Sequence, residues 1–141
     1  MHAYAPYSGY CVGAAAETAD GRIFVGTNME NASYGLTVCA EIGALQSALS
    51  AGALDKVRRL AIVGGQIHGS PTDAPETTPP CGRCRQLIAE AASMGKHDIE
   101  VWFADLYVRQ VEMQPISALL PHPFSTSHLT EMNDTEQEPF T

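Results

Sequence analysis

Basic residues are scarce in this chain of 141 residues, which has 8 lysines and arginines against 16 aspartates and glutamates. Nucleic-acid affinity depends on neutralising phosphates with Lys and Arg, so the net charge of −8 argues against a nucleic-acid partner. Long apolar runs are also missing, and no stretch approaches the roughly 20 residues of a membrane helix. The first residues contain no basic patch followed by an apolar core, so we expect no signal peptide.

Cysteine is present at four positions in a sequence without a secretion signal. Cysteines in a reducing compartment more often hold a metal or take part in chemistry than form disulfides. We therefore expect a cytoplasmic protein whose cysteines are functional. Apolar residues make up 45 % of the chain and charged residues 17 %, which is typical of a globular protein.

Strand and helix patterns alternate along the chain, which is typical of the α/β class. Strands are expected at 11–17, 23–27, 60–63, 99–104 and 107–113, with a hairpin turn at Asp20-Gly21. A helix should begin near Thr37, with Thr37 as its N-cap, and it has apolar residues at helical spacing, which are Ile42, Leu45 and Leu49. A second helix should run over 81–95 and bury Leu87, Ile88, Ala91 and Ala92, and a helical turn should follow at 117–120.

The length matches one domain, which we expect to span residues 1–129 because no linker interrupts them. The loop at 64–80 is long and rich in Pro, Thr and Gly, which points to a functional role. Residues 130–141 contain four acidic and no basic side chains, so an acidic, disordered tail is expected there.

Two short segments can bind a metal, Cys39-Ala40-Glu41 and Pro80-Cys81-Gly82-Arg83-Cys84. Each lies at the expected start of a helix, where free N–H groups and a partial positive charge favour a thiolate. Cys81 and Cys84 can reach one ion, and Cys39 would add a third ligand. Three ligands leave a position for water, as in catalytic zinc sites, and Glu41 could take the proton of that water.

Other interpretations of the cysteines are weaker. A redox pair at Cys81 and Cys84 lacks a thioredoxin-like context. A closed structural zinc site would need Cys11 as its fourth ligand, but Cys11 lies in the first strand and is expected in the core. The histidines at 2, 68, 97, 122 and 128 form no His-x-x-x-His pair and are expected on the surface or in loops.

In these motifs the chain resembles the small cytidine deaminases, from Tyr4 to about Leu129. The likeness rests on an opening motif (4–8 and 12–15), a sugar-binding loop (28–37) and two zinc motifs (39–41 and 80–86). All four segments occur in the family's order, so the likeness is specific. It implies a three-layer α/β/α sandwich around a mixed five-stranded sheet.

The resemblance also implies zinc-dependent hydrolytic deamination of free cytidine and deoxycytidine, giving uridine or deoxyuridine plus ammonia in pyrimidine salvage. Zn²⁺ would be held by Cys39, Cys81 and Cys84, and Glu41 would be the proton shuttle. The implied substrate-binding residues are Tyr10, Asn28, Glu30 and Ala40, with Tyr34 and Phe124 reaching across subunit boundaries in a homotetramer.

Three departures from the family are visible. Ile42 follows Cys-Ala-Glu, where tetrameric members carry an Arg that offsets the charge of the three thiolates, so Arg83 or Arg85 would have to compensate. Almost nothing precedes the opening motif, where members carry a helix. The loop at 64–80 is longer than usual and could reshape the rim of the pocket.

Two further functions compete with this one. The same chemistry could act on a modified cytidine or on a blasticidin S-like cytosine nucleoside, since blasticidin S deaminases share the Cys-Gly-Arg-Cys-Arg-Gln segment. The intact loop Asn28 to Asn31 favours simple nucleosides. A non-catalytic, zinc-stabilised nucleoside-binding module is the alternative of another class, and Glu41 argues against it because a binder needs no proton shuttle.

Overall fold

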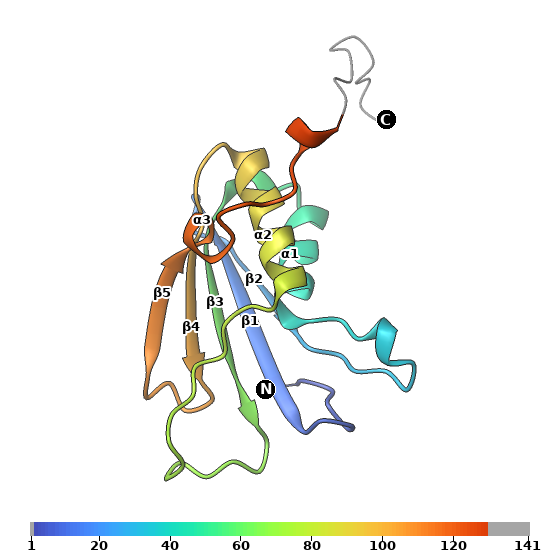
Figure 1. The fold of residues 1–141 in the computed structure, drawn as a ribbon, viewed down its shortest axis with the longest axis vertical. Coiled ribbons are helices and arrows are strands. Elements are labelled where there is room, and N and C mark those ends of the chain that lie inside the picture. The colour runs from blue at the N-terminus through green and yellow to red at the C-terminus, as the bar shows by residue number, and fades with distance from the viewer. Residues whose placement is uncertain (1, 130–141) are drawn as a thin grey trace.

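The computed structural model describes residues 2–129, which form a mixed five-stranded sheet with helices packed against it (Figure 1). The strands are β1 (Tyr10–Thr18), β2 (Ile23–Thr27), β3 (Val57–Gln66), β4 (Glu100–Asp105) and β5 (Val111–Pro115). The α-helices are α1 (Ala40–Ser50), α2 (Gly82–Gly95) and α3 (Ile116–Leu119), with 3₁₀ turns at Tyr34–Leu36, Leu54–Lys56 and Thr126–His128. The α/β class and the mixed five-stranded sheet are thus confirmed.

The strand order across the sheet is β2-β1-β3-β4-β5. β3 and β4 are parallel and are connected through α2, whereas the other neighbouring pairs are antiparallel. The Asp20-Gly21 hairpin is confirmed, and Gly21 adopts a φ of 81°, which favours glycine. A parallel pair needs a crossover connection, and this crossover carries the segment with Cys81 and Cys84.

The hydrophobic core lies between one face of the sheet and the helices. Ala14 and Ala16 on β1 face α1, and small residues at these positions allow the helix to approach closely. The approach is tightest at Gly26 on β2, where an added Cβ would lie 2.3 Å from the carbonyl oxygen of Ala40. The start of α1 is therefore held against the sheet by backbone contact.

The other face of the sheet has large apolar side chains that are exposed in this chain. They come from three strands and comprise Ile23, Val25, Trp102, Val111 and Met113. The described residues place α1, α2 and α3 against one common core on the opposite face, so the second helical layer of a three-layer sandwich is not formed by residues 2–129.

The first helix begins later than predicted. Thr37 ends a 3₁₀ turn, and Val38 forms a β-bridge with Met29, so α1 starts at Ala40 with Cys39 as its N-cap. The prediction that Leu87 is buried is also wrong. Its exposed fraction is 40 %, and that of Leu49 is 55 %, because both leucines line a groove between α1 and α2 instead of facing the sheet.

The strand ends differ most from the predicted ranges in β3 and β5, whereas those of β1 and β4 differ by one residue. β3 is longer than 60–63 at both ends because it pairs with β1 from Tyr10 to Thr18. The last strand begins at Val111 because residues 105–110 form a turn around the buried carboxylate of Asp105. That carboxylate accepts hydrogen bonds from the backbone N–H groups of Tyr107, Arg109 and Gln110.

Among residues 2–129, none of the helices combines the length and hydropathy needed to cross a membrane. The acidic tail predicted at 130–141 lies outside the described residues.

Candidate active site

Cys39 and Glu41 are positioned by the start of α1. Residues 37–38 run extended beside Met29, and the chain then turns into the helix, with Cys39 as its N-cap and Glu41 in its first turn. The backbone N–H of Gly43 donates to the carbonyl of Cys39. Glu41 is only 4 % exposed, so its carboxyl group is held in the interior next to the cysteine.

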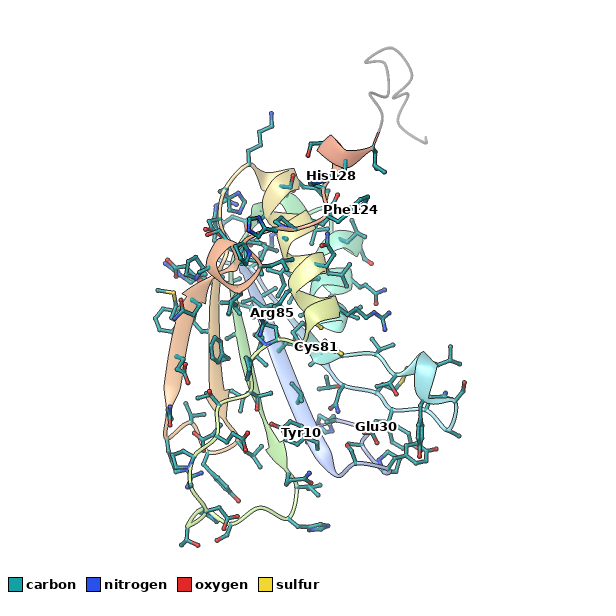
Figure 2. The ribbon with its side chains drawn as sticks, viewed as in Figure 1. Tyr10, Glu30, Cys81, Arg85, Phe124 and His128 are labelled. Carbon is teal, nitrogen blue, oxygen red and sulfur yellow. The ribbon has the colours of Figure 1, made fainter. Side chains whose placement is uncertain are left out.

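Cys81 and Cys84 are positioned by the start of α2 in the same way. Cys81 is the N-cap, and Cys84 lies in the first turn, where a spacing of three residues puts both on one side of the helix. The approach to the helix is fixed as well: Thr78 N–H donates to the carbonyl of Ala104, and Arg85 Nε donates to the carbonyl of Pro80. Figure 2 shows Cys81 at the end of α2 nearest the start of α1.

The three sulfur atoms lie within 4.8 Å of one another, and those of Cys39 and Cys81 are 3.9 Å apart. Sulfurs at the corners of a tetrahedral zinc site are about 3.8 Å apart for Zn–S bonds of about 2.3 Å. The cluster therefore fits a zinc ion held by three thiolates with a fourth position open. Cys11 does not belong to it and is buried in β1, which agrees with its predicted core role.

The electrostatics of the cluster favour one thiolate at neutral pH. Interaction with the Cys84 thiol, aided by Cys81 and by the charge of Arg83, lowers the pKa of Cys39 to about 6. Burial and the negative charge of Glu41 oppose this effect. The same contact with Cys39, together with burial, raises the pKa of Cys84. A cation bound between the three sulfur atoms would stabilise the thiolate form of the other two cysteines as well.

Of the two arginines proposed to offset the thiolate charge, Arg83 lies near the cluster and Arg85 is engaged elsewhere. Arg83 Nη1 donates to the carbonyl of Thr37 at 3.5 Å, two residues before Cys39. Arg85 donates to the carbonyls of Pro80 and Leu119. Ile42 is buried and carries no charge.

A cavity of about 170 Å³ opens beside the cysteines. The two segments that contain the clustered cysteines and the surrounding loops form its lining, which consists of Val12, Asn28, Thr37, Cys39, Ala40, Glu41, Thr78, Pro79 and Cys81. A second cavity, of about 280 Å³, is lined by Tyr7, Ser8, Glu30, Tyr34 and Thr37. Because Thr37 lines both, the two cavities adjoin. A larger cavity, at the other end of α2, contains none of the cysteines.

Asn28 and Glu30 are held in place by the backbone of the opening motif. Asn28 Oδ1 accepts from Val12 N–H at 2.9 Å, and its Nδ2 donates to the Tyr10 carbonyl at 2.8 Å. The Glu30 carboxylate accepts from the Ser8 hydroxyl and from the N–H groups of Tyr7 and Ser8, which lowers its pKa. Both side chains are thus fixed and keep hydrogen-bonding capacity toward the cavities.

The other predicted substrate-binding residues lie at different distances from the cavity. Tyr10 lies behind the wall of the cavity, where the Tyr10 hydroxyl is 2.8 Å from the hydroxyl of Thr78. Tyr34 is exposed and packs edge-to-face on Tyr7. Phe124 is also exposed, and Figure 2 shows it beside His128, away from Cys81 in the same chain. The chain's own cavity therefore does not contain Phe124.

Three residues of this region were not predicted from the sequence. Thr78 and Pro79 line the cavity, but nothing in the composition of their loop separates them from its other Thr and Pro residues. Asp105 holds the turn after β4 and pairs with Arg109 at 2.8 Å, and Arg109 in turn donates to the carbonyls of Pro71 and Asp73. The long loop before Cys81 is thereby anchored to the sheet, and only the tertiary contacts reveal this.

Comparison with known proteins agrees with the geometry. Residues 1–97 match the family model of the cytidine and deoxycytidylate deaminase zinc-binding region. A cytidine deaminase of Halalkalibacterium halodurans is 41 % identical over 132 residues, which cover 94 % of this chain and 88 % of that protein.

Solved structures give the same result. The crystal structure of cytidine deaminase from Burkholderia pseudomallei is 44 % identical with a TM-score of 0.72, over 87 % of this chain and 88 % of that one. Cytidine deaminase from Mycobacterium tuberculosis is 38 % identical with a TM-score of 0.64, over 88 % and 86 % of the two chains. A cluster of three cysteines that fits zinc, the matching family model and these likenesses lead to one conclusion: this chain belongs to the cytidine and deoxycytidylate deaminase family of zinc-binding proteins.

Proposed function

We propose that this protein catalyses the zinc-dependent hydrolysis of cytidine and deoxycytidine to uridine and deoxyuridine, with release of ammonia, and that it serves pyrimidine salvage. The observation that carries the proposal is the buried Glu41 beside three cysteine sulfurs that leave one zinc position open to a cavity. The related proteins named above, which are cytidine deaminases, support the same reaction.

Cys39, Cys81 and Cys84 would hold the zinc ion. When bound, zinc lowers the pKa of a coordinated water to about 7, so that hydroxide is available at neutral pH. The carboxylate of Glu41 would take a proton from the attacking water and deliver it to ring N3, which makes C4 of the pyrimidine electrophilic. After the resulting hydroxide adds at C4, Glu41 would take the proton of the new C4 hydroxyl and pass it to the amino group. The C–N bond then breaks, ammonia leaves and the C4 carbonyl forms. Proton transfer of this kind contributes typically 10²–10⁴-fold to the rate.

The two adjoining cavities suit the two parts of a nucleoside. We place the pyrimidine in the cavity beside Cys39, against the backbone of Ala40, with Tyr10 behind the wall. The ribose would extend past Thr37 toward Asn28 and Glu30, whose fixed side chains can bind the sugar hydroxyls. This contact does not need a 2′-hydroxyl, so both nucleosides should react.

The exposed positions of Tyr34 and Phe124 support a homotetramer in which these aromatic side chains reach the sites of neighbouring subunits. Covering an exposed aromatic ring whose backbone is fixed stabilises the association of the subunits. We further propose a cytoplasmic location, because all four cysteines are free thiols, and a reducing compartment would keep them so.

Turnover of the zinc-loaded protein tests the proposal. Loss of the cytosine ultraviolet absorbance and release of ammonia should both follow addition of cytidine or deoxycytidine. Glu41→Gln is the matched variant: it should keep the zinc content and fold but lose at least 10²-fold in kcat. Zinc-loaded wild-type protein that binds cytidine without turnover would instead indicate a binding module. Turnover of blasticidin S or a modified cytidine in preference to cytidine would reassign the substrate.

A further inference from the structure

The side chain of Gln86 binds the backbone of Phe124 at both of its polar groups. Gln86 Nε2 donates to the Phe124 carbonyl at 2.7 Å, and Phe124 N–H donates to Gln86 Oε1 at 3.2 Å. A primary amide can make such a reciprocal pair because it carries a donor and an acceptor side by side. The pair fixes residue 124 in both position and orientation.

This contact connects the C-terminal segment to the helix that carries two of the metal-ligating cysteines. Gln86 follows Cys84 by two residues on α2, and the intervening Arg85 donates to the Leu119 carbonyl at 3.1 Å. Two adjacent side chains of α2 thus hold the segment 119–124. The start of α2 positions both the metal site of its own chain and the backbone of Phe124.

The ring of Phe124 faces outward, and the residues that follow Phe124 hold it in this orientation. The ring of His128 stacks on that of Phe124, with centroids 5.4 Å apart. Ser125 and His128 form a reciprocal capping interaction that closes the turn between them. Phe124 nevertheless stays 60 % exposed. An aromatic ring that is held rigidly and left exposed is suited to a partner surface, because little conformational entropy is lost when it is covered.

We propose that Gln86 is a positioning residue, which presents Phe124 to the substrate cavity of a second copy of this chain. The inference rests on the proposed function, in which Phe124 reaches the substrate site of a neighbouring subunit. It adds that the amide of Gln86 sets the place of this ring, so that α2 serves the metal site of one subunit and the substrate site of the next.

Gln86→Leu tests the role because leucine has a similar size but cannot form either hydrogen bond. We expect KM for cytidine to rise about tenfold while kcat changes by less than threefold and zinc content stays unchanged. The backbone N–H of Phe124 should also exchange with deuterium faster, which is a readout independent of activity. Gln114→Leu, at an exposed position of β5, is the matched control and should leave all of these quantities unchanged.

A double variant separates positioning from a general structural effect. If Gln86 acts through Phe124, Phe124→Ala alone should raise KM, and adding Gln86→Leu to it should raise KM no further. Additive effects of the two substitutions on KM would overturn the proposal. An unchanged KM in Gln86→Leu, with wild-type protein active, would overturn it as well, without affecting the proposed function. No turnover by the wild-type protein would overturn both.

Mixed assemblies test whether the ring acts in a second copy. Glu41→Gln subunits have an inactive site but an intact Gln86–Phe124 pair, whereas Gln86→Leu subunits have an active site and a mispositioned ring. When the two are unfolded together and reassembled with zinc, some active sites should receive an intact ring, and part of the activity should return to the wild-type KM. If KM stays at the Gln86→Leu value in every mixture, the ring acts in its own chain and the proposal is wrong.

Discussion

Gly26→Ala is predicted to disturb the active site although the residue lies on a strand outside the cavity. An ideal Cβ at this position would be 2.3 Å from the Ala40 carbonyl oxygen and 2.4 Å from the Ala44 nitrogen. Both are backbone atoms of α1, so no rotamer change can relieve the clash. A carbon–oxygen contact of ordinary length is about 3.3 Å, so α1 has to move by about 1 Å.

The cost follows from this displacement. Overpacking a core costs typically 1–3 kcal/mol, and a clash with helix backbone belongs at the upper end, so we expect a loss of about 3 kcal/mol in the free energy of unfolding. Ala40 lies between Cys39 and Glu41, and a misplacement of about 1 Å at catalytic groups can cost roughly 10²-fold in rate. Urea unfolding and kcat for cytidine measure the two effects.

Two other glycines provide graded controls. Gly35 has nothing within 4 Å of an added Cβ, so Gly35→Ala should change stability by less than about 0.5 kcal/mol. In Gly43→Ala the new Cβ would lie 3.3 Å from the Cα of Gly26, and the tight contact should be offset by the gain of about 1 kcal/mol for alanine in a helix. The reasoning is refuted if Gly26→Ala is as stable and as active as Gly35→Ala.

Three further predictions concern charge and hydrogen bonding around the site. Arg83→Ala should weaken zinc retention about tenfold in competition with a chromogenic chelator, because the charge of Arg83 adds to the larger effect of the Cys84 thiol in lowering the pKa of Cys39, whereas Arg83→Lys should retain most of the affinity. Burial would raise the pKa of Asp105, but the N–H donors of its turn and the Arg109 guanidinium outweigh it and lower the pKa to about 2. Because this value lies below that of the unfolded chain, the carboxylate stabilises the fold above about pH 4, and the contribution is lost as pH falls toward 2. The difference in urea stability between wild type and Asp105→Asn should therefore shrink from pH 7 to pH 3, and a difference independent of pH would contradict it. Tyr10→Phe removes the hydrogen bond to the Thr78 hydroxyl and should lower the free energy of unfolding, measured in urea, by about 1 kcal/mol. The same substitution made in the Thr78→Val variant should cause no further loss, because the hydrogen bond is already absent there.

The metal cluster was predictable because its signal is local. Cys39-Ala40-Glu41 and the Cys81–Cys84 pair each lie within one helical turn near a predicted helix start, and in the structure Cys39 and Cys81 are the N-caps of α1 and α2. The expected zinc chemistry therefore agrees with the observed sulfur cluster. The predicted start of α1 at Thr37 was wrong because Val38 pairs with Met29, a contact across the loop that no helix propensity contains.

The burial of individual leucines was less predictable. Leu45 and Leu49 follow the same helical spacing, yet Leu45 is buried and Leu49 is 55 % exposed. The spacing indicates one apolar stripe, but the angle at which α1 lies on the sheet decides which edge of the stripe faces the core. The arrangement in Figure 1, with α1 and α2 on the same face, turns Leu49 into the groove between them.

The amino-acid sequence by itself indicated the α/β class, the three cysteines that can hold a metal and the neighbouring carboxylate, because these signals depend on periodicity and on spacings within single turns. Only the tertiary structure decided that Arg83 and not Arg85 lies beside the thiolates, that Thr78 lines the cavity, and that Gln86 holds Phe124. The hydrogen bonds made by Arg83, Arg85 and Gln86 each join residues that are 34 or more positions apart in the chain. The position of Thr78 in the cavity wall depends on contacts of the same long-range kind. Their formation is set by the packing of α1 and α2 on the sheet, and no local preference of the chain encodes it.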